Sequence, residues 1–264
     1  MLPGTLVQVG AAALEKGTLL LDRFIPSWMA AGASGWTDGA VRGSSSSGET
    51  DWVVLVFVII IAVPLIGLMV WLRKKKVREY RAWAAQNGFH YEPRDDTVAE
   101  LSTGEPFQEG SSRMGMDVFR GQYRGMHVMF FHYQYTTGFG KDRESHPFQV
   151  AAIGLPAPRP RLDIGHEGWW SRRFTADIDF ENQAFNNHYK INCDSRRFAF
   201  DIIHPRTMEW MLSDPRALHN EWRFEGQWLL TWRAGGLNFE DVFLYLDFLI
   251  DIYSQVPRFV WANQ

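Results

Sequence analysis

Cysteine is nearly absent from this 264-residue sequence, in which Cys193 is the one cysteine. A single cysteine cannot form a disulfide within its own chain, so no disulfide framework holds the fold together. This composition suits a reducing compartment. The sequence also lacks the Cys-x-x-Cys, His-Glu-x-x-His, Gly-x-Ser-x-Gly and Gly-Lys-Ser/Thr signatures of common metal, hydrolase and phosphate-binding sites.

A strong excess of charge of one sign is also missing, because the net charge is only −3. Such a value gives no reason to expect a nucleic-acid partner. The charge is unevenly distributed, however. Residues 73–82 hold six basic residues and one acidic residue, whereas the regions on both sides are net acidic. The sequence therefore has a basic collar between two acidic regions.

Charged residues are completely absent from the 21 residues Trp52–Leu72. At a rise of about 1.5 Å per residue, a helix of this length is about 30 Å long and matches the hydrocarbon core of a bilayer. Trp52 and Trp71 lie at its two ends, where indole rings anchor membrane helices at the interface. The pattern predicts one transmembrane helix with these two tryptophans as interfacial anchors.

The distribution of lysine and arginine predicts the orientation of this helix across the membrane. The 20 residues before it contain only Arg42, whereas the 20 residues after it contain six basic residues. Since basic residues stay on the cytoplasmic side, residues 1–51 are expected outside the cell membrane and residues 73–264 in the cytoplasm. The residues predicted to contact the lipid surface are Arg73, Lys74, Lys75, Lys76, Arg78 and Arg81.

The segment before the span has two parts. Residues 5–25 place apolar side chains at helical spacing, which predicts an amphipathic helix on the outer leaflet or on a partner. A partly ordered tail is the alternative interpretation. Residues 31–50 are half glycine and serine, which is typical of a flexible linker.

The sequence after the span predicts an α+β domain of antiparallel hairpins. A basic juxtamembrane helix over 73–88 ends at Gly88, and the domain occupies 89–264. A long C-terminal helix, capped by Asn238, is expected over Phe239–Val256. Strands are expected at Asp117–Arg124, Met126–Tyr135, 147–156 and 174–181, with prolines ending the third after residue 156 and a further hairpin over 222–233 that turns at Glu225-Gly226.

Three carboxylates are the strongest candidates for a metal site. Asp177, Asp179 and Glu181 alternate, so on a strand they point to one face and can hold a divalent cation. A solvated sheet face explains the same pattern without a metal. No other cofactor is predicted.

Catalytic residues are not assigned, because the remaining candidates have simpler explanations. Cys193 lies near His188 and His204, but cysteine is commonly a small buried apolar residue. His127 and His132 have odd spacing and fall on opposite faces of a strand. Core packing accounts for the later tryptophans, although they could instead line an apolar pocket: Trp169, Trp170, Trp210, Trp222, Trp228 and Trp232.

Two stretches carry a resemblance to known sequences. They are REYRAWAAQNGFHYEP after the span and DFENQAFNNHYKINCDSRRFAFDIIHPRTMEWML, with Glu181, Phe185-Asn186, Tyr189, Asp194, Ala199 and Pro205. Together they resemble uncharacterised bacterial single-span membrane-anchored proteins, in families of domains of unknown function. The resemblance covers residues 73–264 and implies a protein of the bacterial inner membrane. It implies no catalytic residues.

These features favour a non-catalytic protein-interaction or membrane-complex accessory domain, with the bilayer and a membrane or cytoplasmic protein as partners. One alternative is a sensory domain that binds an apolar small ligand or lipid in an aromatic pocket. Another is a metal-dependent enzyme with dispersed site residues, among them Asp177, Asp179 and Glu181.

Overall fold

The computed structural model describes residues 50–166 and 178–262. They fall into two compact units, of which one comprises residues 50–66 and 137–145. The other unit comprises residues 67–136, 146–166 and 178–262. The predicted amphipathic helix at 5–25 and the linker up to residue 49 lie outside the described residues.

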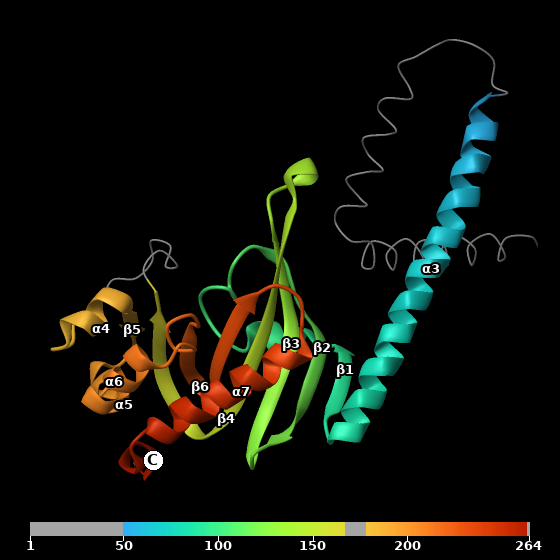
Figure 1. The fold of residues 1–264 in the computed structure, drawn as a ribbon. Helices are drawn as coiled ribbons and strands as arrows, with labels where there is room; N and C mark the ends of the chain where they lie inside the picture. Colours follow the sequence, from blue (N-terminus) through green and yellow to red (C-terminus); the bar gives the residue numbers. More distant parts are fainter. Residues whose placement is uncertain (1–49, 167–177, 263–264) are drawn as a thin grey trace, which may run out of the picture. The chain divides into compact units, whose positions relative to one another are not determined.

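Helix α3 (Thr50–Asn87) contains 38 residues and joins the predicted span to the predicted juxtamembrane helix without interruption. It accommodates Pro64 in its interior. The helix ends at the expected place, because Gly88 takes a φ of +75°, a conformation that favours glycine. One long apolar helix therefore precedes the domain (Figure 1).

A six-stranded sheet forms the centre of the domain, in the order β1-β2-β3-β4-β5 with β6 also paired to β4. The pairings of β1 with β2, β2 with β3, and β4 with both β5 and β6 are antiparallel. This arrangement confirms an α+β fold with an antiparallel sheet (Figure 1). The strands are β1 (His90–Arg94), β2 (Ser111–Tyr123), β3 (Met126–Thr137), β4 (Glu144–Gly165), β5 (Lys190–Cys193) and β6 (Trp222–Ala234).

The tight turn between β2 and β3 forms where the sequence predicts it. Arg124 and Gly125 take φ values of +49° and +81°, which suit a two-residue hairpin turn. The pairing of β2 with β3 is irregular between Met116 and Phe119, and Asp117 within that irregularity has a φ of +49°. A bulge of this kind redirects a side chain.

The predicted hairpin over 222–233 is wrong. The structure has one strand, β6, paired with β4 from Trp222 opposite Ile164 to Ala234 opposite Phe148. Gly226 has a φ of +58°, so its turn-like conformation is absorbed in an irregularity of the ladder. The expected break after residue 156 is also wrong, because β4 continues through its prolines with two shifts of register.

The region between β4 and β6 is mainly helical, and it contains α4 (Gln183–His188), α5 (Arg196–Ile202) and α6 (Pro205–Ser213). The predicted strand over 174–181 is not formed in its described part, residues 178–181. The Asn186 side chain occupies the backbone there, because its oxygen accepts a hydrogen bond from the Phe180 N–H at 3.0 Å and its nitrogen donates to the Phe180 carbonyl at 2.7 Å. Asn182 then starts α4, since its side chain accepts a hydrogen bond from the Phe185 N–H.

The C-terminal end of the described chain contains two helices, and the first occupies the predicted range apart from its last residue, Val256. Helix α7 (Phe239–Gln255) starts at Asn238, whose side chain accepts a hydrogen bond from the Glu240 N–H at 3.1 Å. Helix α8 (Arg258–Ala262) follows after Pro257. Proline lacks the N–H that a continuous helix would need, so the helix stops before it.

Two hydrophobic cores lie on opposite faces of the sheet. The larger one packs α7, α5, α6 and the end of α3 against side chains such as Phe130 and Ile153. The smaller one includes Met129 and Phe131, and it is covered by η1 (Asp96–Glu100) and Phe107. This cover is confined to part of the face.

Candidate functional site

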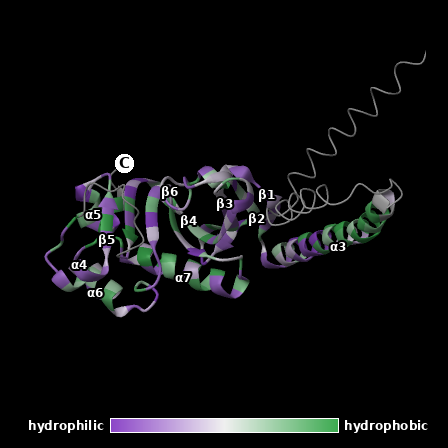
Figure 2. Cartoon of the chain, turned by 90° about the horizontal axis from the view of Figure 1, so that it is seen from above, coloured by the Kyte–Doolittle hydropathy of each residue, from purple (hydrophilic) through white to green (hydrophobic). Residues whose placement is uncertain are grey.

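The first half of α3 exposes its apolar side chains. The large apolar residues described between Trp52 and Leu72 are 37% to 62% exposed. Among the described residues, α3 is the one helix that is long and apolar enough to cross a membrane. Figure 2 shows its hydrophobic residues giving way to hydrophilic ones toward the domain. Trp52 and Trp71 are both exposed, and their role as interfacial anchors stays a prediction.

The basic collar follows directly on the apolar segment. All six predicted lipid-contacting residues, Arg73, Lys74, Lys75, Lys76, Arg78 and Arg81, are exposed. Lys75 lies 3.8 Å from the Glu79 carboxylate one turn further along. Lys76 also contacts the domain, through its ammonium group. For all six, lipid contact stays a prediction.

Asp117 is the domain residue that holds Lys76. The Lys76 ammonium donates to one Asp117 oxygen at 2.9 Å, and the Tyr91 hydroxyl donates to the other at 2.7 Å. Burial works against the charge of Lys76, but the hydrogen bond and charge of Asp117 raise its pKa overall. Burial, together with the same carboxylate, raises the pKa of Tyr91. The bulge in β2 thus positions a buried carboxylate to receive the helix.

Tyr80, one turn after Lys76, lies within an aromatic cluster. Its ring centroid is 5.1 Å from that of Phe239, 5.6 Å from Phe119 and 5.9 Å from Tyr91. These pairs are tilted or edge-to-face, which are the arrangements that aromatic rings favour. Tyr80 therefore joins α3 to β1, β2 and α7.

Trp83 continues this contact one turn further. Its ring centroid is 4.4 Å from Phe239 and 5.7 Å from Phe89. Ala84 beside it is buried in the larger core. Since Leu72 and Lys76 are four residues apart, about 6 Å of helix separates the apolar segment from the contact of Lys76 with the domain. The helix that carries the apolar segment thus ends as a core element of the domain.

His132 lies close to the contact between α3 and the domain, because it is paired with Met116, next to Asp117, in the β2–β3 ladder. Burial lowers the pKa of His132, opposed in part by the charge of Asp117 and assisted by that of Lys76. Its Nε2 is buried, and no hydrogen-bond partner for it is found among the described residues. The contact between α3 and the domain therefore includes a histidine whose charged form is disfavoured by burial.

An open groove lies on the sheet face that η1 covers only in part. It consists of two adjoining hollows of about 540 Å³ and 430 Å³, which share His127 and Trp228. The first hollow is lined by Gly88, Arg120, Gly121, Gln122, His127, Val128, Met129 and Trp228. The second is lined by Gly125, Met126, His127, Gly154, Leu155, Pro156, Gln227, Trp228 and Tyr253.

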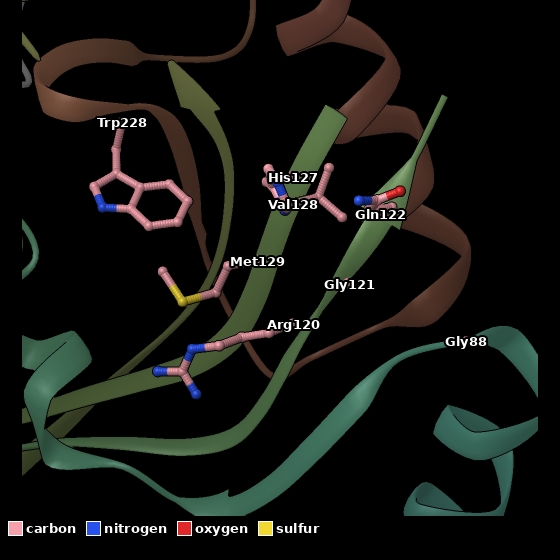
Figure 3. Close-up of a pocket in the computed structure, with 8 residues that line it drawn as sticks. All are labelled: Gly88, Arg120, Gly121, Gln122, His127, Val128, Met129 and Trp228. Carbon is pink, nitrogen blue, oxygen red and sulfur yellow. The ribbon is translucent and has the colours of Figure 1, made fainter. Parts of the chain in front are cut away.

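Gly154 keeps the centre of the groove open. A Cβ at this position would lie 3.3 Å from the His127 Cβ and 3.9 Å from the Trp228 ring. Figure 3 shows the Trp228 ring, the Met129 thioether and the Arg120 guanidinium following one another along one hollow. Arg120 binds Glu92 at 2.7 Å and also pairs with Asp95, so its charge is balanced within the protein. The groove is therefore amphipathic, with little net charge.

The predicted carboxylate cluster does not form a described site. Asp179 and Glu181 are exposed and lie outside any strand, and Asp177 lies outside the described residues. Alternation on a strand, which was the reason to group them, does not apply to residues 178–181. Within the described ranges, no group of three or more His, Cys, Asp or Glu side chains is placed to hold a metal ion.

The cysteine and histidine candidates have separate structural roles. Cys193 is half-buried on β5, and burial raises the pKa of its thiol, which opposes formation of a nucleophilic thiolate. The His188 Nδ1 lies 3.2 Å from the Ala184 carbonyl within α4. The His204 ring accepts a hydrogen bond from the Thr207 N–H and caps α6.

The tryptophans divide between core and groove. Trp222 and Trp232 are buried in the two cores, and Trp210 packs against the larger one. Trp228 is the tryptophan of this set that lines the groove. Trp169 and Trp170 lie outside the described residues.

A buried ion pair in the sheet was not predicted from the sequence. The fully buried Arg223 of β6 donates to Asp163 of β4, while its other nitrogens donate to the Ser102 hydroxyl at 2.7 Å and the Glu105 carbonyl at 2.9 Å. Arg223 thus holds the segment after η1 against the sheet. The residues are 60 positions or more apart, so no local pattern signals the cluster.

Comparison with known proteins gives one structural likeness. No protein-family model matches the chain, and a search of curated proteins finds no relative. The crystal structure of the mycobacterial trehalose monomycolate transport factor A, TtfA, is similar to 68% of this chain over 95% of its own, with 17% identity and a TM-score of 0.49. A likeness at this level does not define a function for this chain.

Proposed function

We propose that this chain is a single-span, membrane-anchored accessory protein whose domain binds a protein partner and performs no catalysis. One observation carries the proposal: α3 begins as an exposed apolar helix and ends inside the domain core at Tyr80, Trp83 and Ala84. Such a helix presents the domain close to the lipid surface. The alternative of a metal-dependent enzyme has no described cluster to support it.

The collar supports a proposed orientation with the domain in the cytoplasm and residues 1–51 outside the membrane. We also propose, from the sequence resemblance, that the chain belongs with uncharacterised bacterial single-span proteins of the inner membrane. A reporter fused after Gln264 tests the orientation, because it should be active only in the cytoplasm. Activity on the outside would overturn this part of the proposal.

The groove is the proposed partner-binding surface. Gly154→Leu fills its centre between His127 and Trp228, whereas Gly236→Ala adds a methyl group where nothing lies within 4 Å. Affinity purification from solubilised membranes should recover a reproducible partner with the wild type and with Gly236→Ala. Recovery should fall at least several-fold with Gly154→Leu. Recovery of the wild-type chain alone would contradict the proposal.

Binding of an amphipathic small ligand such as a lipid is a second candidate, favoured by the size of the groove. Hollows of about 300 Å³ or more accommodate small molecules, and each hollow here exceeds that size. Mass spectrometry of the purified chain should then detect one co-purified lipid species, which Gly154→Leu depletes and Gly236→Ala retains. Equal lipid content in both variants would exclude the groove as its site.

A further inference from the structure

The hairpin between β3 and β4 ends in an aromatic residue that packs against nothing described. Phe139 is 95% exposed, more than any other large apolar residue that the structure describes. It occupies the N-cap position of η2 (Gly140–Asp142), and its carbonyl accepts the Asp142 N–H at 3.2 Å. The tip is therefore a hydrogen-bonded turn in which the Phe139 side chain points to solvent.

The turn geometry depends on glycine beside Phe139. Gly138 has a φ of +76°, and a Cβ there would lie 2.0 Å from the Asp142 carbonyl oxygen. Lys141 and Arg143 are offset by Asp142 and Glu144, so the tip carries no net charge. Any attraction of this tip to a surface must therefore come from the apolar ring.

Contacts of α3 with β2 and β3 show which way β3 runs relative to α3. Trp83 lies opposite Phe130, with ring centroids 6.3 Å apart. Lys76, two turns closer to the apolar segment, binds Asp117, which lies beside His132. Moving from Phe130 to His132 along β3 thus follows α3 from Trp83 toward Leu72.

Strand β3 continues in this direction beyond His132. Strand β3 remains paired with β2 as far as Thr136, opposite Ser111. Four further residues at about 3.3 Å each extend it by about 13 Å. Along α3, the apolar segment ends at Leu72, only about 6 Å beyond Lys76. The domain thus directs Thr136, which immediately precedes the tip in the chain, toward the proposed membrane.

We propose that Phe139 inserts into the lipid bilayer that α3 spans, as a second membrane contact of the domain. This inference rests on the proposed membrane anchoring. A single aromatic ring binds a bilayer weakly, but the tether keeps it at a high effective concentration near the surface. Since the tip carries no net charge, the contact is apolar and insensitive to salt.

Photocrosslinking of the full chain in liposomes tests the inference. A benzophenone amino acid replaces Phe139 or, as a matched control, Phe200, which is 49% exposed on α5. In Figure 1, α5 lies at the opposite end of the sheet from β1 and β2. Mass spectrometry should find lipid adducts at position 139 at least five-fold above those at position 200. Equal yields, or adducts to protein instead, would overturn the inference.

Alkaline extraction of the same liposomes separates this inference from the proposed function. A chain that resists extraction but gives no lipid adduct at position 139 retains its anchoring and loses only the tip contact. A chain that is extracted overturns both.

Hydrogen exchange gives an independent check. In liposomes, Phe139→Ser should lower the protection of the backbone amides of residues 137–143. In amphipol, where there is no bilayer, the same substitution should leave that protection unchanged. Unchanged protection in liposomes would also overturn the tip contact.

Discussion

The two parts of α3 differ both in composition and in surroundings, because the first is almost entirely apolar and the second mixes basic residues with a few apolar ones. From Trp52 to Leu72 the apolar side chains are exposed, whereas Tyr80, Trp83 and Ala84 pack into the larger core. The comparison shows that one helix serves two environments, with the collar between them. A substitution should therefore affect the folding of the domain only in the second part.

The largest expected difference comes from removing a large side chain in each part. Trp83→Ala should lower the free energy of unfolding of the domain by about 3 kcal/mol, because it leaves a cavity among aromatic rings. Val58→Ala should change it by less than about 0.5 kcal/mol. Denaturant titration of the full chain in detergent, followed by near-UV circular dichroism, measures both. Equal losses would show that the two parts do not differ.

A smaller effect is expected at the carboxylate that holds Lys76. Asp117→Ala should cost about 2 kcal/mol, because the Tyr91 hydroxyl loses its buried acceptor and alanine disfavours a φ of +49°. Asp117→Asn should cost less, since asparagine tolerates this conformation and still accepts the hydrogen bond. The two unfolding curves check this order. A more damaging Asn substitution would show that the charge on Asp117, rather than its hydrogen bond, dominates.

The smallest effect concerns His132 and pH. Burial lowers its pKa below the ordinary value of 6.5, so the unfolded chain binds the proton more readily than the folded chain. The stability that neutral His132 allows is therefore present above about pH 6.5 and lost as pH falls below it. His132→Gln should flatten the dependence of unfolding free energy on pH between about pH 7 and pH 5. An unchanged slope would assign that dependence to other groups.

Features set by neighbouring residues could be predicted from the sequence. The apolar run, the stop at Gly88 and the turn at Arg124-Gly125 each depend on local conformational preferences, and each forms as expected. The hairpin turn predicted at Glu225-Gly226 does not form, and the reason is the opposite one. Its local signal was overridden by pairing with β4 along the whole of β6. Tertiary pairing overrides local preference in this way.

The functional surfaces were harder to foresee because they depend on contacts between distant residues. Lys76 was assigned to the lipid surface, but its partner Asp117 is 41 positions away. The groove brings together Arg120, His127, Gly154 and Trp228 from four strands, and no spacing in the sequence marks them as a set. Trp228 was among the candidate pocket tryptophans, but the sequence did not separate it from Trp222 and Trp232.

Two truncated chains test most directly whether the end of α3 belongs to the domain core. One begins at Arg73 and keeps Lys76, Tyr80 and Trp83, whereas the other begins at Phe89 and lacks them. We expect the first chain to unfold cooperatively in denaturant, and the second to be less stable by several kcal/mol or to aggregate. Equal stability of the two chains would contradict the account, because α3 would then be a tether alone.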